Sequence, residues 1–377
     1  MVDTLNSREH LYKVDILRGI AILAVFVFHC QVALYPQYVV ESYQAGRLNV
    51  NSVSDFLLYF SPSAFGWTGV ELFLLISGFL IHFGYLANPD RFNLRTFYSK
   101  RFWRIYPPYF LVLVFLCLTG AGLTFYVSTK EGILDFGLHA LLLHNLLDRT
   151  FFSINTSFWS LALEAQLYLI YPVFLLIRKY AGIQKTFFLT LVISLILYVI
   201  GSFGIYLNGW NSYSFFIIKT WYMWAAGAYL AEWYYTGRGL FNKSALLWGV
   251  LFFFALCMSK YFSVTKHFQP YCATFLWLAF FEWTIQSSVF RADRFLMKVL
   301  TVIGLCSYSI YLIHQPMIEW MFSYLDFNTI DSDLARYGGM LLALLAAFGI
   351  IFLISYALYR FIELKSIAIG NNLRSRR

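Results

Sequence analysis

An arginine and a histidine, Arg18 and His29, stand eleven residues apart in the apolar stretch DILRGIAILAVFVFHC, which runs from Asp15 to Cys30. An imidazole titrates near neutral pH and can move protons, while a guanidinium binds phosphate or carboxylate. Eleven residues are about three helical turns, so both side chains share one helix face, roughly 16 Å apart along the axis. Because charged groups inside a bilayer are costly and usually face a polar path, this face is a candidate functional site.

Three further titratable side chains lie inside apolar stretches: Glu71 in GVELFLLISGFL, Glu164 in FWSLALEAQ and His314 in YLIHQP. A carboxylate there must be paired or protonated, because an isolated charge in hydrocarbon is costly. Together with His29, these groups could form an acid–base site in which a histidine acts as general base. For His314, a buried histidine with satisfied hydrogen bonds is an equally good interpretation.

Two arginines, Arg101 and Arg104, lie in the basic segment KRFWRIYPPY. Because a guanidinium can bind phosphate through two hydrogen bonds, these residues, with Arg18 and its neighbour Asp15, are candidates for holding a phosphorylated ligand. Two simpler interpretations stay open. Arg101 and Arg104 could contact lipid headgroups and fix the topology, and Asp15 could form a structural i, i+3 pair with Arg18.

The composition places these side chains in a membrane protein. Of the 377 residues, 60% are hydrophobic and 12% are charged, whereas a soluble protein carries about 25% charged residues. The net charge of +9 is therefore interpreted as a topology signal, and no nucleic-acid partner is expected. The five cysteines lie in or beside apolar stretches without a C-x-x-C pair, so neither a disulfide framework nor a metal site is predicted.

The positions of the apolar stretches predict an all-α, polytopic fold, because a span needs about 20 mainly apolar residues. We expect about ten transmembrane helices, at residues 15–36, 66–87, 105–123, 158–178, 185–207, 213–235, 243–260, 268–288, 297–324 and 336–361. The short, partly charged stretch 131–148 is interpreted as an interfacial or re-entrant helix. With no linker or low-complexity segment, the chain is expected to be one membrane domain over 1–377, with a basic cytoplasmic tail at 362–377.

Lysine and arginine are concentrated in alternate loops, which predicts that both termini are cytoplasmic. His29 then lies roughly 21 Å from the cytoplasmic start of its helix, and Glu164 roughly 9 Å below the outer surface. In a hydrocarbon core about 30 Å thick, these depths coincide. We therefore expect His29, Glu164, Glu71 and His314 to converge in the outer half of the bilayer, and the arginines to lie near the cytoplasmic mouth.

Six segments, taken together and in this order, resemble the integral membrane acyltransferase-3 family. They are DILRGIAILAVFVFH, GVELFLLISGFLI, FYSKRFWRIYPPYF, FWSLALEAQLYLIYP, CSYSIYLIHQP and YRFIE, which spread over nearly the whole chain. The first holds Arg18 and His29 at the family's Arg-x10-His spacing. Departures are modest: Ile16 stands where glycine is common, and Ala165 stands where a second acidic residue often follows the glutamate.

The resemblance implies transfer of an acyl group, most often acetyl, from cytoplasmic acetyl-CoA or another acyl-CoA to a hydroxyl. The implied acceptor is a cell-surface or lipid-linked glycan, and some members act on small molecules instead. The implied setting is a multi-pass protein of the inner (plasma) membrane. The acceptor, the acyl group and the oligomeric state stay open.

The family's essential arginine and histidine correspond to Arg18 and His29, and the expected roles of the remaining residues follow from this chemistry. His29 would act as general base or carry the acyl group briefly, two routes that the sequence does not separate. Three groups of residues are expected: catalytic His29, Arg18 and Glu164; donor-binding Arg101, Arg104, Ser77 and Asp15; and acceptor-side Glu71, Tyr168, Tyr311 and His314.

A transporter or flippase for a lipid-linked glycan is the rival hypothesis, because it would also need intramembrane charges and a basic inner mouth. A transporter would move its substrate without consuming acyl-CoA.

Overall fold

The computed structural model describes residues 4–34, 56, 59–120, 122–202, 215–262, 267–327 and 333–372. Its secondary-structure elements there are all helices, which confirms the all-α prediction. Six of these helices are long and apolar enough to cross a membrane, or seven if one bent pair is a single span. The protein is therefore an all-α polytopic membrane protein. Its contacts divide into two units, residues 1–76 with 239–356, and residues 77–238 with 357–377.

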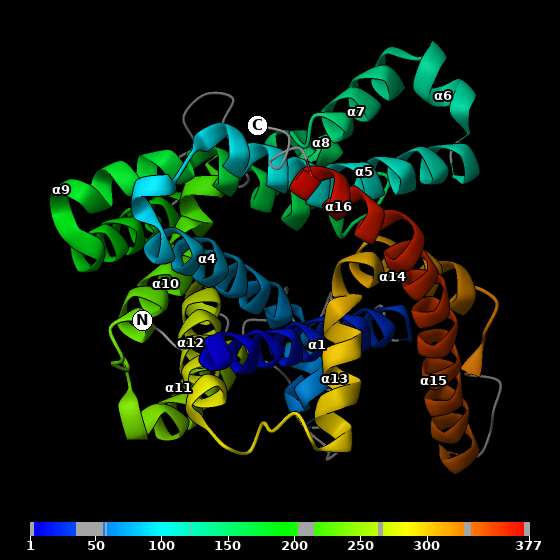
Figure 1. Cartoon of the computed structure of the whole chain (residues 1–377). Coiled ribbons are helices and arrows are strands. Elements are labelled where there is room, and N and C mark those ends of the chain that lie inside the picture. Colours follow the sequence, from blue (N-terminus) through cyan, green and yellow to red (C-terminus); the bar gives the residue numbers. More distant parts are fainter. Residues whose placement is uncertain are drawn as a thin grey trace. The chain divides into compact units, whose positions relative to one another are not determined.

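The first unit is organised around its first helix, which packs against η1, α12, α13 and α14 (Figure 1). Its elements are α1 (Thr4–Leu34), η1 (Pro62–Thr68), the start of α4 (Gly69–Ala87), η4 (Asn242–Ser244), α11 (Ala245–Tyr261), α12 (Gln269–Gln286), α13 (Phe295–Leu305), α14 (Ser307–Phe322) and α15 (Asp333–Leu358). The pair α11 and α12 lies side by side. Helix α1 begins at Thr4, eleven residues before the predicted span 15–36, so its first turns are polar.

Glycines let the neighbours of α1 approach it closely. A side chain on Gly304 of α13 would meet the backbone of α1, with Gly19 N only 3.1 Å from the added carbon. Similarly, a side chain on Gly69 would lie 2.9 Å from Val25 Cγ2. Small residues at helix crossings are how helices in membranes pack, because close contact replaces the missing hydrophobic driving force.

Near its start, α1 is hydrogen-bonded to the end of α12. The sequence predicts that this end of α1 faces the cytoplasm. Lys13 Nζ donates to the carbonyls of Ile285 and Ser287 at 3.0 and 3.1 Å, and Tyr12 OH donates to Phe290 O at 2.6 Å. A lysine at a helix C-terminus satisfies carbonyls that have no partner within the helix and complements the helix dipole. These bonds fix the height of α1 within the unit.

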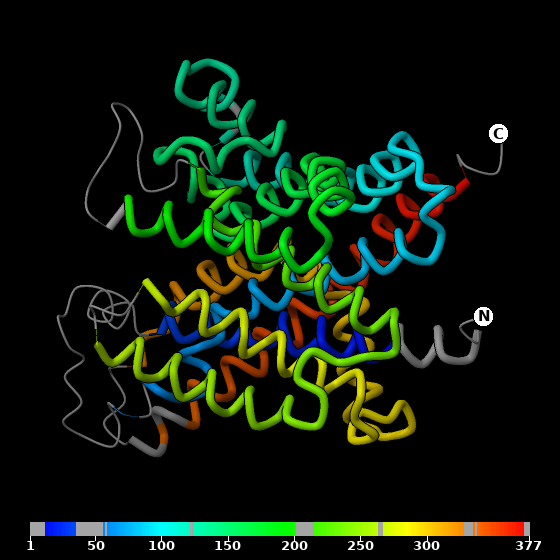
Figure 2. The backbone as a smooth tube through the Cα atoms, turned by 90° about the vertical axis from the view of Figure 1, so that its left-hand side faces the viewer, coloured from blue at the N-terminus to red at the C-terminus, as the bar shows by residue number. Residues whose placement is uncertain are grey.

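The second unit contains two long helices and several short ones. Its elements are the end of α4, η2 (Pro89–Arg91), α5 (Leu94–Thr119), α6 (Leu123–Ser128), α7 (Lys130–Ala140), η3 (His144–Leu146), α8 (Asp148–Phe151), α9 (Phe158–Ser202), α10 (Phe216–Tyr235), the π-helical turn η7 (Tyr359–Glu363) and α16 (Leu364–Asn372). Residues 364–372 of the predicted tail form α16, which packs along α5 (Figure 2). The last five residues of that tail lie outside the described part of the chain.

Three predicted segments can be compared with the observed helices. Helix α9 covers the predicted spans 158–178 and 185–207 as far as Ser202, and its break at Gly182, where φ is 77°, lies between them as predicted. Glycine adopts this conformation without strain. The predicted span 297–324 is not one helix, because α13 and α14 meet at a 75° bend. The segment 131–148 is broken into α7, η3 and α8, each too short to span a bilayer.

The α1–α13 crossing yields a stability prediction. Gly304→Ala is expected to destabilise the protein by about 1–3 kcal/mol, because the added methyl group collides with backbone rather than with a movable side chain. Gly349→Ala on α15 is the matched control: nothing lies within 4 Å of its added carbon, and alanine is up to about 1 kcal/mol more favourable in a helix. Thermal unfolding in one detergent compares them, and equal stability would refute the close crossing.

Candidate functional site

Two histidines meet in the first unit. His29 Nδ1 on α1 lies 2.8 Å from His314 Nε2 on α14, and the rings are nearly parallel with centroids 5.0 Å apart. His314 is fully buried, and its Nδ1 is 2.9 Å from the carbonyl oxygen of Tyr311. The hydrogen bond joins residues 285 positions apart, so the α1–α14 packing creates it. A pair of this kind can hold and pass a proton in an apolar setting.

The other predicted acceptor-side residues of this unit lie near the same helices. The Tyr311 ring lies 5.3 Å from the His314 ring and meets Phe73 edge-on at 6.0 Å. Glu71 is buried in the first turn of α4, where the helix dipole favours a carboxylate. Its Oε2 is buried and has no hydrogen-bond partner among the described residues.

Asp15 and Arg18 form an ion pair with 3.1 Å between Arg18 Nη1 and Asp15 Oδ1. Both side chains are mostly buried, at 17% and 18% exposure. The structural i, i+3 interpretation therefore describes a real contact. A guanidinium has five N–H donors, and the bond to Asp15 uses one of them.

The second unit gathers another set of predicted residues around one tyrosine. Tyr168 OH donates to Glu164 Oε1, one helical turn earlier on α9, and accepts from Ser77 Oγ at 3.1 Å. The guanidinium carbon of Arg101 lies 5.6 Å from the centre of the Tyr168 ring, a cation–π distance. Glu164, Tyr168, Ser77 and Arg101 thus form one polar cluster on α4, α5 and α9.

A hollow of about 280 Å³ opens beside this cluster. Its walls are largely apolar, and Arg101 supplies the only positive charge among the lining residues: Tyr98, Arg101, Phe102, Ile105, Tyr106, Leu141, Leu142, Leu143, Ala165, Gln166, Tyr168 and Leu169. The Nε atom of Arg101 is buried and has no hydrogen-bond partner among the described residues. Such a cation beside an empty apolar space suits a ligand with an anionic group and an aliphatic arm.

The wall of this hollow is held by an amide pair. Asn145 Nδ2 donates to Gln166 Oε1 at 3.0 Å, and Gln166 Nε2 donates to Leu142 O at 2.8 Å. These bonds tie the loop after α7 to α9. Arg104 does not line the hollow. Arg101 lies within helix α5 and not at its first residue, because α5 begins at Leu94.

Sequence reasoning missed a second polar network in this unit. His82 Nε2 lies 2.9 Å from Glu232 Oε1, which also accepts from Arg178 Nε, and His82 Nδ1 lies 3.2 Å from Tyr171 OH. The signal that found Glu164, a titratable residue inside an apolar stretch, is also present at His82 and Glu232. This network joins α4, α9 and α10 and leaves no polar ring nitrogen of His82 unpaired.

The segment between α7 and α8 holds a third buried group that sequence reasoning did not use. The rings of His139 and His144 stack in parallel with centroids 3.9 Å apart. His139 Nδ1 also lies 3.1 Å from Asp135 Oδ1. Burial, together with the neighbouring His139, lowers the pKa of His144 to about 2, so this ring is neutral at physiological pH.

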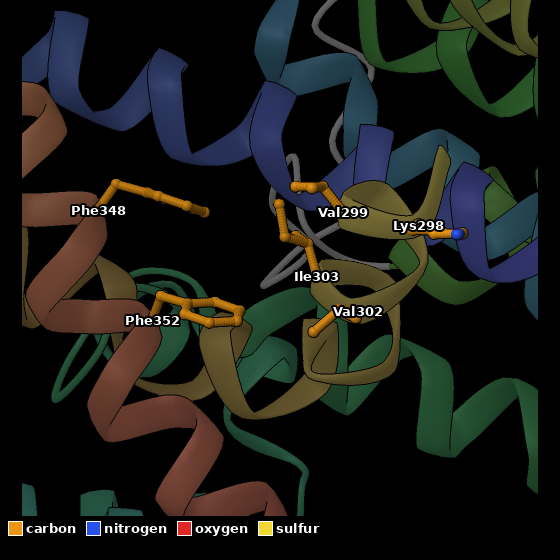
Figure 3. A pocket seen from close by; sticks show the side chains of 6 residues that line it. All are labelled: Lys298, Val299, Val302, Ile303, Phe348 and Phe352. Carbon is orange, nitrogen blue, oxygen red and sulfur yellow. The ribbon is translucent and has the colours of Figure 1, made fainter. Parts of the chain in front are cut away.

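One apolar hollow and one acidic anchor have simpler roles. A hollow of about 350 Å³ lies between α13 and α15 (Figure 3), lined by Lys298, Val299, Val302, Ile303, Phe348 and Phe352. It offers no acid–base pair and suits a lipid tail.

Glu282 accepts hydrogen bonds from the backbone amides of Leu240, Phe241 and Asn242 at 2.7 to 3.1 Å. These bonds fix the loop before α11.

The predicted site residues therefore fall into two groups. His29, His314, Tyr311, Glu71, Asp15 and Arg18 belong to the first unit, and Glu164, Tyr168, Ser77, Arg101 and Arg104 to the second. The expected meeting of His29 with His314 is present. The expected convergence of Glu164 with His29 stays a prediction.

Comparison with known proteins gives one family and several relatives. The profile of the family described as "Acyltransferase domain" matches residues 11–360. The chain is 26% identical to the O-acetyltransferase OatA of Staphylococcus aureus, over 96% of this chain and 58% of that protein. It is 27% identical to a putative acetyltransferase, ORF330, of Acidianus two-tailed virus, over 67% of this chain and 74% of the relative.

A third relative, an uncharacterized protein of Haemophilus influenzae, is 29% identical over 34% of this chain and 58% of its own length. The chain thus spans 58% of the length of the first relatives that it matches. No solved structure matches the chain.

The Tyr168 cluster yields a test of its importance. Tyr168→Phe removes the donor to Glu164 and leaves Ser77 Oγ without this acceptor in a buried site. An intramolecular hydrogen bond contributes about 0.5–1.5 kcal/mol, and a buried polar group left unpaired costs about 1–3 kcal/mol, so we expect the free energy of unfolding to fall by about 1–3 kcal/mol. Tyr180→Phe, at a side chain that is 80% exposed, is the control. Equal thermal unfolding of the wild type and the Tyr168→Phe protein in one detergent would contradict a structural role for this cluster.

Proposed function

Because the chain belongs to the acyltransferase family whose profile matches residues 11–360, we propose that it transfers an acyl group to a hydroxyl of a cell-surface or lipid-linked glycan. The donor is acyl-CoA, with acetyl-CoA the first to test. The observation that carries the proposal is the hydrogen-bonded pair of His29 and His314 inside apolar helices. A base in that position matches the proton transfer that acylation of a hydroxyl requires.

The reaction needs one group that moves a proton, and we assign this role to His29. In the first route, His29 takes the proton of the acceptor hydroxyl while the hydroxyl oxygen attacks the thioester carbonyl. The carbon–sulfur bond then breaks, and the leaving thiolate takes the proton from His29. In the second route, the imidazole attacks the thioester carbonyl, the carbon–sulfur bond breaks and the thiolate leaves. The acceptor oxygen then takes the acyl group from His29, and the hydroxyl proton passes to the thiolate.

The donor site is proposed at the hollow beside Arg101. A coenzyme's phosphates would bind Arg101, with Arg104 as a further contact, because guanidinium matches phosphate geometry. Support comes from the buried Nε of Arg101, which has no hydrogen-bond partner among the described residues, and from the apolar walls that suit a pantetheine arm. Ser77 and Glu164 would lie along the path of the thioester.

The acceptor side is proposed at Glu71, Tyr311 and His314 of the first unit. A part for Tyr168 and Glu164 of the second unit in binding the sugar stays a prediction from the sequence. The unpartnered oxygen of Glu71 could accept a hydrogen bond from a glycan hydroxyl. The protein would work in the inner (plasma) membrane, with both termini in the cytoplasm and acyl transfer towards the outer face.

The direct experiment compares cells with and without the protein. Mass spectrometry of their surface polysaccharides is expected to show a mass difference of one acyl group, and fragmentation locates the modified sugar. Purified protein in nanodiscs should consume acetyl-CoA and release free thiol. Glycan movement across the bilayer without thiol release would favour a flippase, and modification of a small molecule alone would replace the glycan as acceptor.

His29→Ala tests the base. General acid–base catalysis contributes about 10²- to 10⁴-fold, so we expect thiol release to fall at least 100-fold while the protein still reaches the membrane. His267→Ala, on an exposed histidine, is the control for loss of an imidazole. Retained transfer by the His29→Ala protein would exclude both routes.

Arg101→Ala tests the donor site. Loss of a charge-assisted bond to phosphate is expected to raise the Michaelis constant for acyl-CoA by roughly 10-fold, with a smaller change in turnover. Arg95→Ala, on an exposed position of α5, is the matched control. Equal donor affinity in the wild type and the Arg101→Ala protein would make Arg101 a topology anchor rather than a donor ligand.

A further inference from the structure

The contacts around the two histidines determine where their protons lie. The carbonyl oxygen of Tyr311 has no hydrogen and can only accept. His314 Nδ1, 2.9 Å away, must therefore carry the proton and donate it. This assignment follows from the partner atoms, which is how histidine tautomers are established when hydrogens are not seen.

The direction of the His29–His314 hydrogen bond follows from the hydrogen bond between His314 and the Tyr311 carbonyl. His314 is fully buried, and a charged imidazolium there would be costly, so the ring is neutral. A neutral ring with its proton on Nδ1 has a lone pair on Nε2. His29 Nδ1 lies 2.8 Å from that lone pair and is therefore the donor.

We propose that His314 is a positioning residue that holds neutral His29 in the Nδ1–H tautomer, so that Nε2 of His29 is the reacting atom. This role in acyl transfer rests on the proposed function, whereas the tautomer does not. In both routes described above, the atom that takes the hydroxyl proton or attacks the thioester is then Nε2. When Nε2 takes the hydroxyl proton, His29 becomes a cation whose Nδ1–H still donates to His314.

The arrangement suits a bilayer. Many catalytic histidines are oriented by a carboxylate, which would place a permanent negative charge among apolar helices at a high cost in free energy. Here the orienting group is a neutral imidazole, itself oriented by a backbone carbonyl. The hydrogen bond becomes charge-assisted, and hence stronger, only while His29 is protonated. The stabilisation therefore appears during the reaction rather than before it.

The tautomer can be observed without any assay of activity. The full-length protein, labelled with ¹⁵N-histidine and held in nanodiscs, is measured by nitrogen NMR, with His29→Gln used to assign the signals. We expect wild-type His29 to be neutral and protonated at Nδ1, the less common tautomer of free histidine. In His314→Leu, which lacks an acceptor, the proton should move largely to Nε2. Wild-type His29 protonated at Nε2 would overturn the proposal.

Kinetics provide the second measurement. His314→Gln keeps an oxygen that can accept from His29 Nδ1–H, whereas His314→Leu keeps none. We expect turnover to fall about 100-fold in the leucine variant and less than about 10-fold in the glutamine variant, with the Michaelis constant for acetyl-CoA unchanged in both.

His267→Gln is the control for loss of a histidine elsewhere, and it should leave both the NMR signal of His29 and the turnover unchanged. Equal losses in the glutamine and leucine variants, or no loss in either, would overturn the positioning role. Absence of acyl transfer by the wild type would refute the proposed function instead, and the NMR result would stand apart from it.

Discussion

The need to pair polar groups inside apolar helices governs how each unit is built. A titratable side chain in hydrocarbon is tolerated only beside a partner, because water cannot supply one. The partners here come from other helices: His314 for His29, Glu232 for His82, and the end of α12 for Lys13. Each pair fixes the height and rotation of one helix against another. The same contacts that stabilise the fold therefore also place the groups that could react.

The sequence predicted the class of fold and much of the first unit's site. Composition was enough to identify a helical membrane protein, and helix depth brought His29 and His314 to one level, where they meet. The break at Gly182 was predictable, because the charged segment 178–185 separates two apolar spans. The 75° bend between α13 and α14 was not, because it leaves the apolar run unbroken. The His82–Glu232 network was not predicted, because neither residue lies in one of the six segments that resemble the family.

Arg101 shows why helix boundaries matter for a functional interpretation. Apolar residues suggested a span from residue 105, which placed Arg101 at a membrane mouth. Helix α5 begins eleven residues earlier, so Arg101 lies about ten ångströms along it and faces the ring of Tyr168. A basic residue near the polar start of a helix can therefore have a partner within the protein. Charge counting alone assigns such a residue to topology.

The long sequence separation of the His29–His314 bond has a consequence for biosynthesis. The two residues are 285 positions apart, and a ribosome adds about 5–20 residues per second, so His29 is made roughly 15 to 60 s before its partner. The partners of Lys13, at residues 285 and 287, arrive almost as late. During that interval the first helix lies in the membrane while His29 and Lys13 lack these partners. The insertion machinery, or lipid headgroups that reach them, would have to shelter these groups until the last third of the chain is made.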